Sequence, residues 1–147
     1  MVRRAIASNE HFELSLAEMH EQGYVYTKET LKRLRAEHPD TDYYFIMGAD
    51  SLLAFDTWKE PQEICDQCVL VAAVRDQMPS GELDRQIAKL KKQYHADIRK
   101  LDSPNLDISS HTIRTRCLEG SSIRYYVPDA VRIYIEDEGI YGSLQSS

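Results

Sequence analysis

The run Cys68-Val69-Leu70-Val71-Ala72-Ala73-Val74 is the longest apolar stretch of the sequence and decides the fold class. It is far too short to cross a membrane, which takes about 20 residues. Its unbroken apolarity predicts a strand buried on both faces, as in a parallel sheet. Short apolar runs at residues 43–47 and 98–101 predict two further strands, and the alternation at residues 12–16 predicts another.

Helical patterns lie between and after these strands. Thr27 can cap the first helix, over residues 27–38, and Pro39 follows its end. Further helices are expected at residues 60–66, 81–94 and 110–119, and from Pro128 to just before Gly139. Alternating strands and helices predict an α/β fold with a mostly parallel sheet, in one domain over residues 1–147. Ligands of such sheets bind beyond the carboxyl ends of the strands.

The charge balance limits the classes of partner. A net charge of −6 argues against broad binding to nucleic acid or to an anionic membrane, although a few local cations suffice for a phosphate ligand. No hydrophobic stretch follows the basic residues near the N-terminus, so no secretory signal is indicated and we expect a cytoplasmic protein.

The cysteines do not predict a disulfide framework, because there are three of them. Cys65 and Cys68 form a C-x-x-C pair, but no second pair of ligands stands at zinc-site spacing. Cys68 also opens the apolar run, where cysteine behaves as a small hydrophobe. We therefore expect no tightly bound metal or cofactor.

Gly48 and Asp50 follow the strand predicted at residues 43–47. Gly48 lets the backbone turn tightly or approach a ligand closely. Asp50 would then stand where an acidic side chain can accept hydrogen bonds from ribose hydroxyls. An equally good interpretation is that Asp50 caps a helix beginning near Ser51.

Trp58 and the pair Tyr26-Thr27 are two further candidates. Trp58, the only tryptophan, stands in a loop-like stretch where it could stack on a flat heteroaromatic ring, although a core position is the commoner role. Tyr26 and Thr27 open a predicted helix, whose exposed amides suit a carboxylate. An ordinary helix cap is the simpler interpretation of that pair.

The segment Ile108-Ser109-Ser110-His111-Thr112-Ile113-Arg114 is the strongest candidate for an anion site. Its serines open a helix, and Arg114 stands one turn after Ser110 on the same face. Backbone amides, hydroxyls and a guanidinium could then bind one phosphate. The alternative is a capped surface helix with solvated arginines, and His111 is expected to face solvent.

Taken in order, these stretches resemble the nicotinate-nucleotide adenylyltransferases of the nucleotidylyltransferase superfamily. The resemblance covers nearly the whole chain and rests on Tyr26-Thr27, Tyr44-Phe45-Ile46, Gly48-Ala49-Asp50, Trp58, Ile108-Ser109-Ser110, Ile113-Arg114-Thr115-Arg116, Gly120, Ser122-Ile123-Arg124-Tyr125, Val127-Pro128-Asp129, Tyr134-Ile135 and Ile140-Tyr141.

The resemblance implies a Rossmann-like nucleotidyltransferase fold and a reaction of NAD synthesis. Nicotinate mononucleotide and ATP, with Mg²⁺ bound to the ATP, would give nicotinate adenine dinucleotide and pyrophosphate by direct displacement. It implies the following roles: Trp58 on the nicotinate ring; Tyr26, Thr27 and Lys59 around its carboxylate; Gly48 and Asp50 at the ribose; Ile108, Ser109 and Ser110 at ATP; and Arg114 as the catalytic contact to ATP phosphate.

The family also has an (H/T)-x-G-H signature after its first strand, and this sequence contains no such pattern. We therefore expect a sheet without the family's first βαβ unit, and a chain that by itself is a poor catalyst, or inactive, and weakly stable. A homodimer that pairs strands would partly repair such a sheet. The alternatives are a non-catalytic nucleotide-binding module and an adenylyltransferase for another substrate, such as phosphopantetheine.

Overall fold

The computed structural model describes residues 1–19, 23–74, 80–102 and 108–142. The chain forms two compact units, Leu16–Asn105 and Met1–Ser15 with Leu106–Ser147. The single domain expected over residues 1–147 stays a prediction. No described helix is long and apolar enough to span a membrane.

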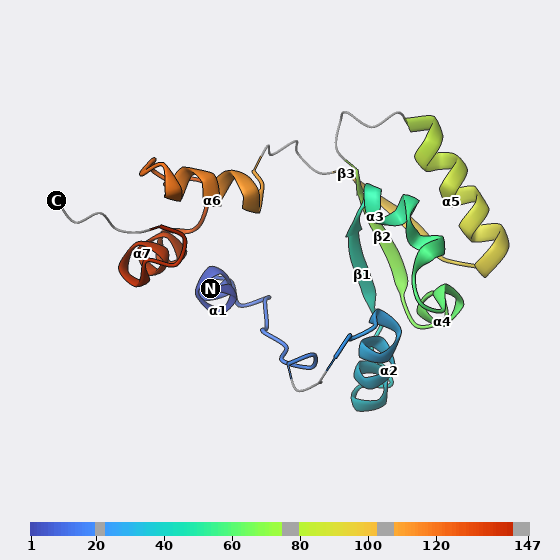
Figure 1. The fold of residues 1–147 in the computed structure, drawn as a ribbon. Helices are drawn as coiled ribbons and strands as arrows, with labels where there is room; N and C mark the ends of the chain where they lie inside the picture. The colour runs from blue at the N-terminus through green and yellow to red at the C-terminus, as the bar shows by residue number, and fades with distance from the viewer. Residues whose placement is uncertain (20–22, 75–79, 103–107, 143–147) are drawn as a thin grey trace. The chain divides into compact units, whose positions relative to one another are not determined.

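The larger unit is built on a three-stranded parallel sheet (Figure 1). Its strands are β1 (Tyr44–Gly48), β2 (Val69–Val74) and β3 (Ile98–Asp102), and β2 lies in the middle. Ile46 is in register with Val71, which is in register with Arg99. The α/β class and the three strands of this sheet are confirmed, each within about one residue of its expected bounds.

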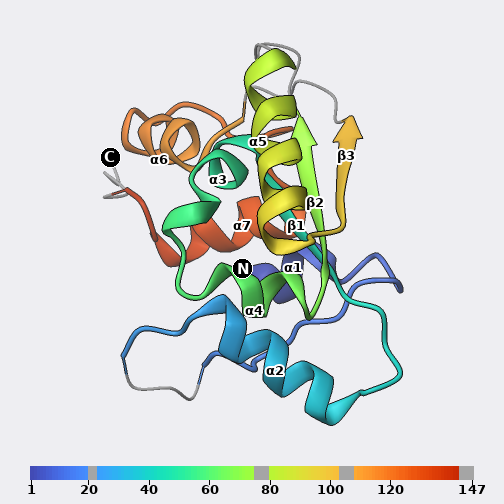
Figure 2. The same cartoon turned by 90° about the vertical axis from the view of Figure 1, so that its right-hand side faces the viewer.

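The described residues of this unit also form helical segments: α2 (Thr27–Glu37), α3 (Ala49–Leu53), the 3₁₀ helix η1 (Phe55–Thr57), α4 (Pro61–Cys65) and α5 (Ser80–Tyr94). Figures 1 and 2 show α3, α4 and α5 on the same face of the sheet. Pro61 occupies the first turn of α4, as expected, since its missing N–H costs nothing there. Thr27 does not cap α2; Tyr26 is the N-cap residue and supplies no side-chain bond.

The core of the larger unit lies between the sheet and these helices. Leu70 and Ala72 of β2 are fully buried there, whereas Val69 and Val71, which point to the opposite face, are only half-buried. The expected burial of β2 on both faces is therefore wrong. Tyr44 and Ile46 of β1 belong to the same opposite face and are 50% and 63% exposed. Strand alternation places these side chains together.

The smaller unit contains α1 (Val2–Ile6), α6 (Ser110–Leu118) and α7 (Asp129–Glu138). Its core is formed by Ile123, Val131 and Ile135. Gly139 follows α7 with φ 59°, the left-handed conformation that glycine adopts without strain, so the stop expected there is confirmed.

Residues 12–16 do not form the expected strand. Phe12 and Leu16 are 61% and 46% exposed. Alternation alone does not make a strand, because the backbone also needs a neighbour for its hydrogen bonds, and no described strand pairs with this segment.

Candidate functional site

A pocket of about 320 Å³ in the larger unit brings together four of the predicted substrate residues. One wall is the start of α2, with Tyr26 and Thr27, and the other contains Trp58 and Lys59. The remaining lining residues are Val25, Thr57 and Ile64. Two segments about 30 residues apart in the sequence therefore form one concave site, within the size range of small-ligand pockets.

The start of α2 presents backbone donors at this pocket. Tyr26 is extended, with φ −94° and ψ 139°, and its carbonyl accepts from the amides of Glu29 and Thr30. The amides of Thr27 and Lys28 precede the first bonds of the helix, and no described residue accepts from them. Such free amides, with the helix dipole behind them, favour an anion.

Trp58 contributes both to the core and to the pocket. Its ring meets Phe45 edge-on at a centroid distance of 6.0 Å and lies 5.4 Å from the ring of Phe55, tilted by 41°. The side chain is only half-buried and lines the pocket with its remaining surface. The two interpretations of this tryptophan are therefore compatible, and its stacking on a ligand ring stays a prediction.

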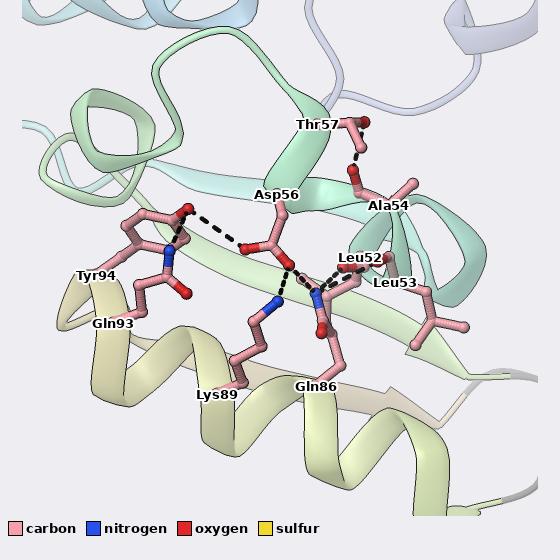
Figure 3. A network of polar contacts seen from close by, with 9 residues as sticks. All are labelled: Leu52, Leu53, Ala54, Asp56, Thr57, Gln86, Lys89, Gln93 and Tyr94. Atoms are coloured by element: carbon pink, nitrogen blue, oxygen red, sulfur yellow. Dashed lines mark hydrogen bonds and ion pairs between the residues drawn. The ribbon is translucent and has the colours of Figure 1, made fainter.

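Asp56 anchors the chain just before the Trp58 wall (Figure 3). Its carboxylate accepts from Lys89 Nζ at 2.7 Å, Gln86 Nε2 at 3.0 Å and Tyr94 Oη at 3.3 Å, all on α5. The hydrogen bonds from Lys89 and then Gln86 hold the pKa of Asp56 below its usual value. Sequence reasoning missed this residue, because its partners stand 30 or more positions away and form no motif with it.

Gly48 and Asp50 stand at the carboxyl end of β1, as expected, but neither lines this pocket. The helix there begins at Ala49 with Gly48 as its N-cap residue, so capping by Asp50 is wrong. Gly48 has an ordinary φ of −67°, and a Cβ built on it would meet no atom within 4 Å. Its backbone therefore does not require glycine, and close approach to a ligand stays the prediction. Asp50 is exposed in the first turn of α3.

The predicted ATP residues lie in the smaller unit, at the start of α6. Ser109 is the N-cap residue, and its Oγ accepts from the amide of Thr112 at 3.1 Å. Ser110 opens the helix, Ile108 is half-buried, and His111 is exposed as expected. The capped helix is confirmed, and the binding of phosphate there stays a prediction.

Arg114 and Arg116 differ in their surroundings, although both are on α6. Arg116 donates to the carbonyl of Ser122 at 2.8 Å and lies 4.7 Å from the ring centre of Tyr126. Arg114 is exposed and has no hydrogen bond or ion pair with any residue that the structure describes. Arg116 therefore stabilises the fold, whereas the guanidinium of Arg114 is available to a ligand.

The C-x-x-C cysteines are protonated at neutral pH. Burial raises the pKa of Cys65 to about 12 and that of Cys68 to about 11, and Cys68 Sγ donates to the carbonyl of Ile64 at 3.4 Å. Metal binding requires the thiolate, which burial disfavours. In the described ranges, no three or more His, Cys, Asp or Glu side chains are grouped so as to hold a metal ion.

Sequence comparison identifies the family. A family model described as cytidylyltransferase-like matches residues 1–116. A probable nicotinate-nucleotide adenylyltransferase of Lachnoclostridium phytofermentans is 40% identical over 141 residues, which cover 96% of this chain and 70% of the relative. One of Clostridium novyi is 36% identical over the same shares. The chain belongs to the nicotinate-nucleotide adenylyltransferase family. It is thus a nucleotidyltransferase by family, and the relatives use nucleotide substrates.

Solved structures of the same fold support the fold of this chain. The nicotinic acid mononucleotide adenylyltransferase of Plasmodium falciparum, complexed with APC, matches with a TM-score of 0.66 at 18% identity, over 92% of this chain and 70% of that chain. The same enzyme complexed with NaAD matches with a TM-score of 0.67. The expected Rossmann-like nucleotidyltransferase fold is confirmed.

Proposed function

We propose that this chain binds nicotinate mononucleotide and ATP and joins them into nicotinate adenine dinucleotide, releasing pyrophosphate. The observation that carries the proposal is the pocket formed by Tyr26, Thr27, Trp58 and Lys59. These residues were singled out from the sequence for a flat ring and a carboxylate, and they line one cavity.

The pocket offers complementary groups to a nicotinate ring. Trp58 supplies an aromatic surface for stacking, and its contacts with Phe45 and Phe55 hold its plane. The amides at the start of α2 and at Lys59 would donate to the ring carboxylate. Nicotinamide has an amide NH₂ at that position, which would oppose these donors without accepting from them. A site that offers only N–H donors therefore favours nicotinate, because two donors that face each other leave a hydrogen bond unmade, which costs free energy.

The chemistry requires positioning rather than a covalent enzyme intermediate. A phosphate oxygen of nicotinate mononucleotide attacks the α-phosphorus of ATP, a new P–O bond forms, and the bond to the pyrophosphate oxygen breaks. Arg114 would bind the ATP phosphates and stabilise the charge that develops during transfer, beside the amides and hydroxyls of Ser109 and Ser110. Ile108 would contact the adenine side, while Gly48 and Asp50 would approach ribose.

Magnesium is proposed to enter with ATP, whose phosphate oxygens are its usual ligands. No described residue is assigned to it, since the chain regions that the structure describes hold no cluster suited to a metal. We further propose a cytoplasmic location, where both substrates would be available.

A homodimer joined through β1 is proposed as the assembly. Among the described strands β1 pairs only with β2, and Tyr44 and Ile46 are exposed beside its other edge. An unpaired edge next to apolar side chains favours pairing with a second copy. Light scattering would detect the dimer, and a charged substitution, Ile46→Lys, should shift it toward the monomer. A monomer at all accessible concentrations would refute this part.

The pocket is tested with its own tryptophan as the reporter. Nicotinate mononucleotide should quench Trp58 fluorescence at lower concentration than nicotinamide mononucleotide. Titration calorimetry should likewise give nicotinate mononucleotide the higher affinity. Phosphopantetheine serves as the competing ligand. Tighter binding of phosphopantetheine or of nicotinamide mononucleotide would refute the assignment of substrate.

The reaction is tested by pyrophosphate release from ATP in the presence of nicotinate mononucleotide. Arg114→Ala should lower kcat/KM at least about tenfold, as expected for the loss of a charge-assisted contact to phosphate. Arg3→Ala is the matched control, because Arg3 is also exposed and has no partner among the described residues of its unit. Substrate binding without turnover would support the non-catalytic alternative.

A further inference from the structure

Lys28 lies at the centre of a group of three carboxylates. Its ammonium bonds Glu60 directly and lies 3.3 Å from Glu29 and 3.7 Å from Glu63. Its side chain is only 13% exposed, whereas the partners are 44 to 51% exposed. A network of three carboxylates around one largely buried lysine side chain holds its geometry better than an isolated exposed ion pair does.

This group joins the two walls of the substrate pocket. Lys28 follows the pocket residue Thr27 on α2, and Glu60 follows the pocket residue Lys59 on the opposite wall. Glu63 precedes Ile64, which also lines the pocket. The ion pair therefore connects residues that stand 32 positions apart, each next to the cavity.

Glu60 has an unusual backbone conformation at this point. It is left-handed, with φ 53° and ψ 63°, and it immediately precedes Pro61. A non-glycine residue in this region carries strain that tertiary contacts must offset. Two contacts hold Glu60 in this conformation beside the Trp58 wall: its carbonyl accepts from the amide of Glu63 at 3.0 Å, and its carboxylate accepts from Lys28.

We propose that Lys28 is a positioning residue for the selectivity of the pocket between nicotinate and nicotinamide. Its bond ties Glu60, which directly follows the pocket residue Lys59, to the start of α2, and this keeps the carboxylate donors aligned. It also compensates three carboxylates beside a site for an anionic ring. This inference rests on the proposed function, because it concerns the same pocket.

The test compares Lys28→Met with Lys28→Arg, each titrated with nicotinate and nicotinamide mononucleotides. Lys28→Met should weaken nicotinate binding about three- to fivefold, the range of one partly exposed ion pair, and nicotinamide binding by less. Lys28→Arg should restore the ratio of the two affinities. Lys32→Met is the control, since Lys32 is exposed on α2 and has no described partner. An unchanged ratio in Lys28→Met would overturn the proposal.

A double-mutant cycle separates positioning from simple charge. The effect of Lys28→Met should shrink when Glu60→Gln is already present, because the bond is then already lost. Equal effects in both backgrounds would overturn the proposal. If Lys28→Met folds too poorly for titration, Glu60→Gln alone should increase acrylamide quenching of Trp58 in the ligand-free chain, and unchanged quenching would overturn it. A wild-type chain that does not prefer nicotinate would refute the proposed function itself, whatever the variants do.

Discussion

Replacing Asp56 by alanine should destabilise the larger unit and loosen the wall that carries Trp58. The Asp56 carboxylate accepts three hydrogen bonds from side chains of α5 (Figure 3). Its removal therefore breaks all three of these bonds between η1 and α5. Phe55, next to it, is fully buried and keeps the apolar part of the packing intact.

The magnitude follows from the exposure of the three donors. The Lys89 side chain is 54% exposed and the Asp56 side chain 27%, so this pair contributes at most about 1 kcal/mol. Gln86 keeps the carbonyls of Leu52 and Leu53 at 3.3 Å, so its amide is not orphaned. The Gln86 and Tyr94 bonds add about 1 kcal/mol together after that compensation. We expect a loss of about 2 kcal/mol, or about 4–8 °C in Tm for a chain of this size.

The sign of the pH dependence is determined by the lowered pKa of Asp56. A carboxyl whose pKa is lower in the folded state contributes stability above its unfolded pKa, and that contribution disappears as pH falls through the folded value. The difference in stability between wild type and Asp56→Ala should therefore be full at about pH 7 and shrink as pH falls below the unfolded pKa of aspartate, because the Asp56 carboxylate is then progressively protonated.

Urea titration followed by Trp58 fluorescence measures this loss, because the only tryptophan belongs to the larger unit. Asp42→Ala is the matched control: Asp42 is exposed in the same unit, and its side chain has no described partner. A midpoint for Asp56→Ala equal to that of Asp42→Ala would refute the reasoning, and so would a loss that is as large at about pH 2 as at about pH 7.

Three further results are expected. Phe55→Ala should cost about 3–5 kcal/mol in urea unfolding, because its ring is fully buried against Trp58 and a cavity would remain; a loss below about 1 kcal/mol would contradict that packing. Iodoacetamide should label Cys65 and Cys68 slowly in the native chain, because their pKa values are about 12 and about 11, and all cysteines should label alike in urea; fast native labelling of Cys65 would be the contrary result. Gly139→Val should lower the thermal midpoint, because φ is 59° there and valine adopts this left-handed conformation at a cost of about 1–2 kcal/mol. An unchanged midpoint in calorimetry would contradict this expectation.

Local pattern was sufficient for most of the regular elements. The helix at Thr27–Glu37, the strand at Val69–Val74 and the helix at Asp129–Glu138 all lie within about one or two residues of their expected bounds. Apolar periodicity and the positions of proline and glycine act over a few residues, so they can be read without knowledge of the rest of the chain.

The wrong expectations concern features that the surrounding structure decides and that the local sequence does not encode. Residues 12–16 alternate correctly but have no described partner strand. The run at β2 is apolar throughout, yet the helices α3, α4 and α5 pack on the face of Leu70, and Val71 on the opposite face stays half-buried. Asp50 was a plausible cap for a helix beginning near Ser51, but the helix begins two residues earlier, at Ala49, with Gly48 as its N-cap residue.

The sequence by itself determined the α/β class and, through its resemblance, the family, and it singled out Tyr26, Thr27, Trp58 and Lys59 as candidate substrate residues. Only the tertiary structure decided that these four share one cavity and that Trp58 serves both core and pocket. It alone located the two polar contacts that anchor the pocket wall: Asp56 with Lys89 of α5, and Glu60 with Lys28 of α2. The physical reason is distance along the chain: these contacts join residues more than 30 positions apart, and no local pattern encodes which loops bring them together.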